Sequence, residues 1–172
     1  MKVWFVPLIC ALASCSNAAG EKDVLPENDA SQLEYARAFI TLSAPSGTKV
    51  LAMCGASAGK VVFVGPEKVT WEDDRISKGS FAFVQKNDGS VDYLFRDATG
   101  KLTSALQDGG TIAKTYQGEN GEMMFLVSYG TGVAETYNVT KDLDGRTIVL
   151  WTSNKQANLM PAKVSAFLAR CL

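Results

Sequence analysis

The feature that most constrains the fold of this chain is the alternation of short apolar segments with tight-turn sequences from about residue 36 onwards. Short segments rich in β-branched and aromatic residues, bounded by Gly, Asn, Asp or Pro, are typical of β-strands. The predicted strands are residues 36–44, 48–54, 60–64, 68–72, 80–86, 90–96, 101–106, 111–117, 122–129, 132–140 and 146–153.

The clearest hairpin joins residues 80–86 to residues 90–96 through the Asn-Asp-Gly turn at 87–89. These residue types tolerate the positive φ that such turns require. Apolar and polar residues alternate along 90–96, which indicates a strand with one apolar face. Residues 123–129 are apolar on both faces, which predicts a central strand or one that lines a cavity.

The two ends of the predicted domain are ambiguous. Residues 161–172 fit both helical and strand spacing, and we favour a strand; a short helix could begin near residues 29–32. The pattern therefore predicts an all-β fold, an antiparallel barrel or sandwich of about eight to ten short strands, lipocalin-like at most, with a short helix at either terminus as the remaining alternative.

Cys54 and Cys171 are the cysteines that fall within the predicted domain, 117 positions apart. A pair of cysteines in an exported protein favours a structural disulfide, which here would join an early strand to the last one. A zinc site is disfavoured, because the chain has no histidine to complete a four-ligand set.

The first residues have the layout of a secretory signal: Lys2, an apolar run over 3–13 and then small residues. Within it, Leu12-Ala13-Ser14-Cys15 resembles the lipobox of bacterial lipoproteins. The resemblance implies that Cys15 is lipidated and becomes the first residue of the mature protein. Ordinary cleavage after residues 16–18 is the alternative, because Ser-Asn-Ala also fits a small-x-small site.

These features divide the chain into a signal peptide (1–14), a lipidated, flexible tether (15–35) and a single all-β domain (36–172). The tether is small and polar, with little to bury. By resemblance to enterobacterial lipoproteins, Ser16 after the cysteine favours the outer membrane, facing the periplasm. A soluble periplasmic or secreted protein is the alternative.

Composition limits the function classes. With 17 basic and 18 acidic residues the chain has no polybasic surface for nucleic acid. It contains no histidine, which removes the Ser-His-Asp and Cys-His nucleophile systems and the commonest metal ligand. We therefore expect no catalytic residues, metal or cofactor. A histidine-free hydrolase that uses carboxylates such as Asp73, Asp74 or Glu135 is an alternative.

Three segments resemble binding loops only in part. The Gly-Ala-Ser-Ala-Gly-Lys run at 55–60 is one residue short of a phosphate-binding loop and is interpreted as a flexible turn. Residues 142–145 lack the twelfth-position Glu of a calcium loop and are interpreted as a hairpin turn. The carboxylates at 72–74 point to opposite sides of an extended chain and are interpreted as a solvated loop.

Four residues are weak candidates for contact with a ligand or partner: Trp71, Trp151, Ser153 and Lys155. Both tryptophans are large enough to anchor a partner, although core packing is the default expectation for each. Ser153 and Lys155 are expected to project from a loop at the rim of the fold.

Taken together, the sequence predicts an exported envelope lipoprotein of non-enzymatic character, which binds a small apolar ligand or an envelope protein. The alternatives are an inhibitor of an extracellular enzyme such as lysozyme, by analogy of architecture, and the carboxylate hydrolase named above.

Overall fold

The computed structural model describes residues 34, 37, 38, 41, 47–65, 67–76, 79–96, 100–157 and 160–172. From residue 47 onwards the described residues form strands and turns and no helix, which confirms the all-β prediction. The ten strands are β1 (Lys49–Val64), β2 (Val69–Ile76), β3 (Phe81–Gln85), β4 (Val91–Arg96), β5 (Leu102–Ser104), β6 (Gly110–Gln117), β7 (Met123–Tyr129), β8 (Val133–Lys141), β9 (Thr147–Ala157) and β10 (Met160–Cys171).

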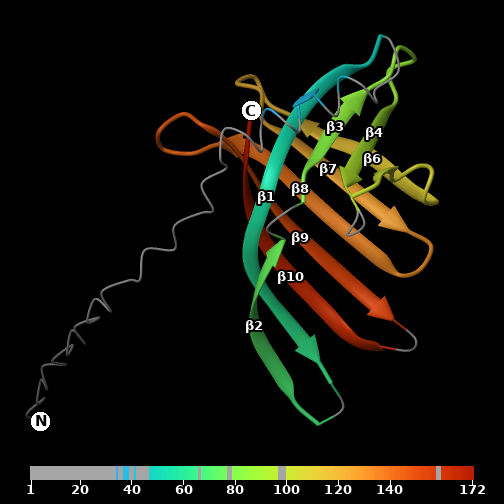
Figure 1. The fold of residues 1–172 in the computed structure, drawn as a ribbon, viewed down its shortest axis with the longest axis vertical. Coiled ribbons are helices and arrows are strands. Elements are labelled where there is room, and N and C mark those ends of the chain that lie inside the picture. The colour runs from blue at the N-terminus through green and yellow to red at the C-terminus, as the bar shows by residue number, and fades with distance from the viewer. Residues whose placement is uncertain are drawn as a thin grey trace, which may run out of the picture.

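All ten strands belong to one antiparallel sheet that curls into a half-barrel (Figure 1). Nine of them follow the order β5-β4-β3-β1-β10-β9-β8-β7-β6, and β2 pairs with β1 beside this path. The first and last strands are therefore neighbours in the middle of the sheet. The two ends of the path are β5 and β6, which follow each other in the chain.

β1 is a single strand of 16 residues, so the predicted flexible turn at 55–59 is wrong. It stays extended because β3 pairs with its first part and β10 pairs with Cys54 and with residues 57–64, and both strands supply backbone partners. The glycine at 59 permits this close pairing: a Cβ there would lie 1.9 Å from the carbonyl oxygen of Ala166. An extended strand also excludes a phosphate-binding loop at 55–60, which requires a strand, a loop and a helix.

The second half of β1 and β2 form a long hairpin that projects beyond the rest of the sheet (Figure 1). β2 continues to Ile76, so the predicted solvated loop at 72–74 is wrong. Glu72 pairs in register with Val61, whereas Asp73 pairs with Lys60, with which it also forms an ion pair. Neighbouring carboxylates in β2 therefore lie on opposite faces, as alternation in a strand requires.

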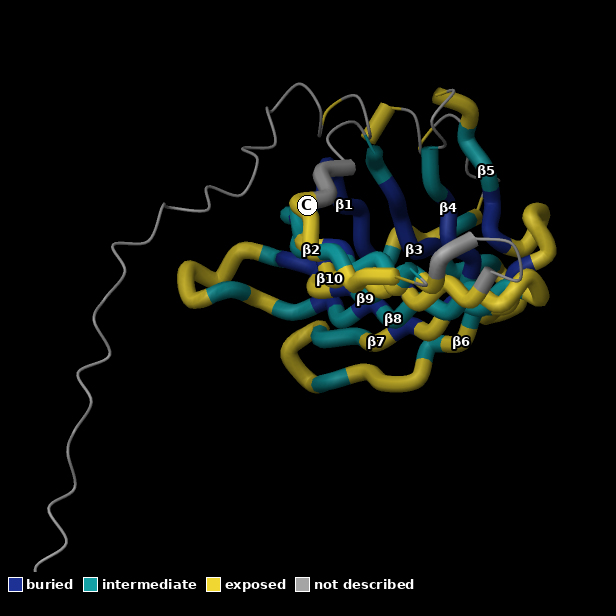
Figure 2. Tube along the Cα trace, turned by 90° about the horizontal axis from the view of Figure 1, so that it is seen from below, coloured by how far each residue is buried: buried dark blue, intermediate teal, exposed yellow. Residues whose placement is uncertain are grey.

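The core lies inside the curl and is built from aromatic rings. Phe83 of β3 stacks on Phe125 of β7, with ring centroids 4.0 Å apart, although these strands are not neighbours in the sheet. Trp151 stacks on Phe167 at 4.2 Å. In the view of Figure 2, the buried parts of β1, β3, β4 and β5 stand over the β6–β10 part of the sheet. The curl thus brings apolar faces from distant strands into contact, and their burial stabilises it.

A second, smaller cluster lies on the opposite face of β1, β3 and β4. It contains the buried residues Met53, Ala82, Val84 and Leu94, with Leu102 packed against them. The strands β3 and β4 are therefore buried on both faces, whereas β6 is mostly exposed.

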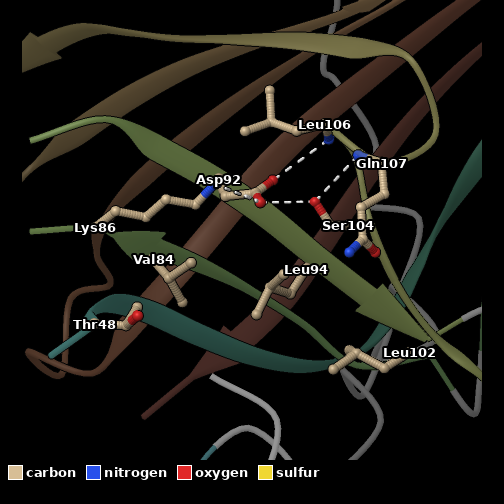
Figure 3. Close-up of a pocket in the computed structure, with 9 residues that line it drawn as sticks. All are labelled: Thr48, Val84, Lys86, Asp92, Leu94, Leu102, Ser104, Leu106 and Gln107. Carbon is tan, nitrogen blue, oxygen red and sulfur yellow. Dashed lines mark hydrogen bonds and ion pairs between the residues drawn. The ribbon is translucent and has the colours of Figure 1, made fainter. Parts of the chain in front are cut away.

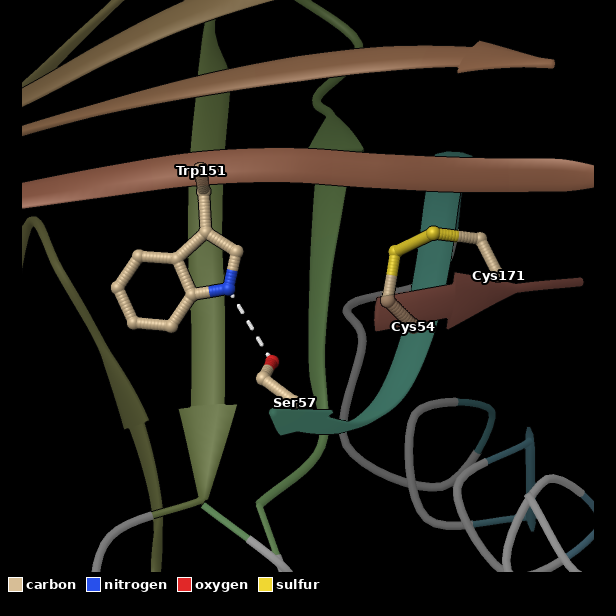
Figure 4. Close-up of a disulfide and its surroundings, with 4 residues drawn as sticks. All are labelled: Cys54, Ser57, Trp151 and Cys171. Atoms are coloured by element: carbon tan, nitrogen blue, oxygen red, sulfur yellow. Dashed lines mark hydrogen bonds between the residues drawn. A yellow bond between two sulfur atoms is a disulfide. The ribbon is translucent and has the colours of Figure 1, made fainter. Parts of the chain in front are cut away.

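The C-terminal segment is a strand, as favoured, and Cys171 forms the predicted disulfide with Cys54 (Figure 4). The two cysteines are register partners of β10 and β1, so the disulfide joins the last strand to the first.

The hairpin turns are largely as predicted. The turn at 87–89 joins β3 to β4, with its glycine at a φ of +83°. The turn at 142–145 joins β8 to β9, and the Asp142 carboxylate accepts backbone hydrogen bonds from Asp144 and Arg146. The segment that partly resembles a calcium loop is thus a hairpin turn, as predicted.

The predicted strand at 36–44 is wrong where it can be checked. Arg37, Ala38 and Thr41 have helical backbone, and the Thr41 hydroxyl donates to the Arg37 carbonyl one turn earlier. This local bond is the back-bonding that Ser and Thr make in helices. Residues 29–32, where a short helix was predicted to begin, lie outside the described residues. No helix in the described part of the chain is long and apolar enough to cross a membrane.

Candidate functional site

Two cavities of ligand size lie on opposite faces of the sheet. The outer cavity, about 340 Å³, lies on the face of β3, β4 and β5 that carries the smaller cluster, and it surrounds Asp92. The inner cavity, about 310 Å³, lies inside the curl near the end of β7 and the start of β8. The two cavities differ in whether their buried carboxylates can still accept a contact from a ligand.

The outer cavity is built around a carboxylate that the protein itself satisfies (Figure 3). Asp92 is 4% exposed. It accepts hydrogen bonds from the Ser104 hydroxyl at 2.6 Å and from the backbone of Leu106 at 3.4 Å, and it pairs with Lys86 at 3.5 Å. Because these donors come from β5 and the turn after it, Asp92 fixes the turn that leads to β6. Its role is therefore structural.

Aromatic side chains make up half of the lining of the inner cavity. Its lining residues are Tyr93 and Phe95 of β4, Tyr129 of β7, Val133, Glu135 and Tyr137 of β8, Trp151 and Lys155 of β9, and Asp108 and Thr131 from the connecting turns. Five of these are aromatic, and their rings provide apolar walls with hydroxyl groups at defined points.

The sheet register explains why these side chains meet. Glu135 pairs with Ser153 on β9 and with Val127 on β7. The next row towards the mouth contains Val133 and its register partners Lys155 and Tyr129. Paired residues in a sheet share a face. Glu135 consequently lies one row inside the mouth, with Tyr137 one row deeper.

A chain of hydrogen bonds holds Glu135 in place. The Tyr137 hydroxyl is 2.8 Å from one oxygen of Glu135, and the Ser153 hydroxyl donates to the other at 3.0 Å. The Tyr137 hydroxyl also lies 3.0 Å from that of Tyr93. A phenol has one proton, so when Tyr137 donates to the carboxylate its oxygen can accept the proton of Tyr93. Donors from both sides thus fix the carboxylate.

The cavity raises the pKa of its tyrosines. Burial, followed by the negative charges of Glu135 and Asp108, raises the pKa of Tyr129 to about 12. Burial, then the charge of Glu135, raises the pKa of Tyr93 well above its ordinary value. Burial likewise raises the pKa of Tyr137. All three phenols therefore stay neutral near neutral pH.

Trp151 connects the cavity to the centre of the sheet. Its indole N–H donates to the Ser57 hydroxyl of β1 at 3.1 Å, close to the Cys54–Cys171 disulfide (Figure 4). This bond satisfies the one polar group of the indole, so its ring can serve as a fixed wall of the inner cavity.

The structure brings three of the four weak candidates together. Trp151 and Lys155 line the inner cavity, and Ser153 lies behind it, 3% exposed and bonded to Glu135. The prediction that Ser153 and Lys155 project from a loop is wrong, because β9 continues to Ala157. Trp71 lies apart from these three residues. Its side chain is 74% exposed on the β1–β2 hairpin, so the expectation that it packs in the core is wrong.

The carboxylates named together from sequence are also separated. Asp73 pairs with Lys60 on an exposed part of the hairpin, whereas Glu135 lies in the inner cavity. The second carboxylate of that cavity is Asp108, which sequence reasoning missed. Sequence reasoning also missed the tyrosines. The alternation of Val133, Glu135 and Tyr137 on one face of β8 is a signal that could have found two lining residues beside Glu135. No group of three or more potential metal ligands occurs among the described residues.

Comparisons with known proteins identify no relative of this chain. No family model, no curated protein and no solved structure matches the chain. Cys15 lies outside the described residues, so its lipidation stays a prediction.

Proposed function

We propose that this protein is a non-enzymatic binding protein that holds a small, largely apolar molecule in the inner cavity. The observation that carries the proposal is the cavity itself. Its volume of about 310 Å³ and its aromatic lining, with a few fixed polar groups, are typical of small-molecule sites. Stacked rings and a disulfide hold the surrounding core together, so the site is largely pre-formed.

The first test uses Nile red, a neutral apolar dye whose fluorescence rises on leaving water. We expect saturable binding by the purified domain. Val133→Trp fills the mouth of the inner cavity and should weaken binding about tenfold or more. Leu143→Trp adds the same indole to the exposed turn at the opposite end of β8 and should leave binding unchanged. Absence of saturable binding, or equal affinities for the two variants, contradicts the proposal.

A hydrolase is a second candidate, because Glu135 and Asp108 line one cavity. Paired carboxylates can act as acid and base on a glycosidic bond. Chromogenic glycosides and esters, incubated with the domain, would test it: turnover lost in both Glu135→Gln and Asp108→Asn favours this candidate over simple binding.

The exposed hairpin supports a protein partner as a further alternative. Val64, Val69, Trp71 and Val164 are all substantially exposed, and register places them on one outer face. If the protein inhibits lysozyme through this face, added domain should protect a bacterial cell-wall substrate from lysis, and Trp71→Ser should abolish the protection.

The proposal also includes anchoring at the cell envelope through a lipid on Cys15. The mass of the intact mature protein from a membrane fraction tests this directly. A chain that begins at Cys15 with added acyl mass supports anchoring, whereas a soluble chain that begins near Ala19 contradicts it.

A further inference from the structure

We propose that the molecule held in the inner cavity is an organic cation, with an aromatic or apolar body and a protonated amine that pairs with Glu135. This inference deepens the binding function proposed above and depends on it. It concerns the charge of the ligand, which the volume and apolar lining alone leave undefined.

The first observation is that Glu135 has hydrogen-bond donors but no counter-cation. Tyr137 and Ser153 each donate to one of its oxygens. It forms no ion pair with a lysine or arginine within the described part of the chain. A half-buried carboxylate is costly without an opposite charge. Each of its oxygens retains a lone pair that can accept another hydrogen bond.

The contrast with Asp92 strengthens this point. Asp92 faces the outer cavity and has a lysine beside it, as well as hydroxyl and backbone donors. Asp92 is therefore neutralised by a lysine of the protein itself. Glu135, by contrast, faces the inner cavity without such an ion pair. The arrangement around Glu135 matches a site whose cation arrives with the ligand.

The second observation is the charge and chemistry of the lining. Asp108 adds a second carboxylate, and the one cationic residue among the described lining is Lys155, which is exposed at the mouth. Trp151 is stacked against Tyr137 and Phe167, and Tyr93 against Phe95. Among the described lining, Tyr129 is therefore the aromatic ring whose face can attract a cation electrostatically. Burial raises the pKa of Tyr129, and the negative charges of Glu135 and Asp108 beside it raise that pKa further. A cation is thus favoured by the two carboxylates and by the ring of Tyr129.

The experiment compares three probes that share a naphthalene body: naphthylmethylamine, naphthylmethanol and naphthoate. Affinities for the full-length protein are measured by calorimetry near neutral pH. We expect the amine to bind about tenfold or more tightly than the alcohol, because a hydrogen bond to a charged partner is worth more than a neutral one. The naphthoate should bind most weakly.

Glu135→Gln then tests the assigned residue, because glutamine keeps the shape of the side chain and removes its charge. We expect it to abolish the preference for the amine, with a much smaller loss in alcohol binding. Glu119→Gln, on the exposed turn between β6 and β7, is the matched control and should retain the preference. Far-ultraviolet circular dichroism confirms that each variant is folded.

The outcomes separate the two proposals. Equal affinities for the amine and the alcohol overturn the cation assignment while the binding function stands. The same holds if the preference survives in Glu135→Gln. If none of the three probes and no Nile red binds, both proposals fail. The comparison of probes on the unmodified protein decides the matter even if Glu135→Gln does not fold.

Discussion

The two halves of β1 share one backbone conformation but lie in different surroundings. The first half pairs with β3 and meets β10 at Cys54, and its residues 52–57 are all buried. The second half pairs with β2 and β10, and Lys60 and Val64 are exposed. Hydrogen-bonded neighbours flank both halves, so pairing does not distinguish them. The difference is that the sheet curls round only the first half, and burial of side chains within that curl is what should stabilise the fold.

The largest effect is expected from Phe83→Ala. The ring is fully buried, and it stacks on Phe125 across the curl. Its removal leaves a cavity and should cost about 3–5 kcal/mol of unfolding free energy. Urea denaturation followed by circular dichroism measures this, and a loss below about 1 kcal/mol would mean that the curl does not depend on the rings.

Removal of the disulfide should have the next largest effect. It closes a long loop between β1 and β10 on the buried half of β1. The double variant Cys54→Ala/Cys171→Ala should lose about 2–4 kcal/mol. Comparison of its urea midpoint with that of the oxidised protein provides the measurement. An unchanged midpoint would show that aromatic packing alone joins the first and last strands.

Gly59→Ala tests the boundary between the two halves. An added Cβ would collide with the backbone of Ala166, so the pairing of β1 with β10 must shift locally. We expect a loss of about 1–3 kcal/mol. Ala58→Gly is the control, because it changes the neighbouring position of β1 without adding an atom. Gly121→Ala is unsuitable because the φ of Gly121 is positive. Equal stability of Gly59→Ala and the parent would place the strands further apart than described.

High pH should distinguish the tyrosines of the curl from an exposed one. Folding raises the pKa values of Tyr93, Tyr129 and Tyr137 above their ordinary value of 10.0. Their contribution to stability is therefore fully present below pH 10 and is lost as the pH rises through the folded values, towards 12 for Tyr129. In a spectrophotometric titration, a fraction of the phenols should ionise only above pH 11 or on unfolding. Ionisation of all five tyrosines near pH 10 in the folded protein would contradict this.

The smallest effect is expected from Trp71→Ala. Its side chain is 74% exposed on the projecting hairpin. Its removal should change the unfolding free energy by no more than about 0.5 kcal/mol, despite the size of the indole. The same urea experiment that tests Phe83→Ala tests this variant. A loss of 2 kcal/mol or more would show that the hairpin packs more closely than its exposure indicates.

Local signals in the sequence were sufficient for several hairpins and for the fold class. The Asn-Asp-Gly turn at 87–89 and the Asp-Gly turn at 144–145 each specify a backbone that few other sequences adopt, and both were placed correctly. Cys54 and Cys171 were the one pair available in the predicted domain, so their disulfide followed from counting. Strand length was harder, because the glycines at 55 and 59 indicate a turn locally, whereas pairing with β10 at Cys54 and again from Ser57 onwards keeps the strand continuous.

The candidate site depends on contacts that a single sequence does not contain. Trp71 and Trp151 both lie in strands, but Trp71 is exposed on the projecting hairpin and Trp151 is a wall of the inner cavity. Likewise, Asp108 reaches the same cavity as Glu135 because the turn after β5 is fixed by Asp92. Such long-range contacts arise from the topology of the sheet, which the periodicity of residues along the chain does not indicate.

The position of β1 and β10 at the centre of the sheet has a consequence for how the chain acquires its structure. β3–β5 and β6–β10 can each form by pairing consecutive strands, but hydrogen bonding along the strand path joins these groups through the contact of β1 with β10. That contact includes Cys54 and Cys171, which are 117 positions apart. Non-local pairing of this kind slows folding. The final strand must therefore be present before the curl and its cavity can close, and a chain truncated before β10 would remain two separate, incomplete meanders.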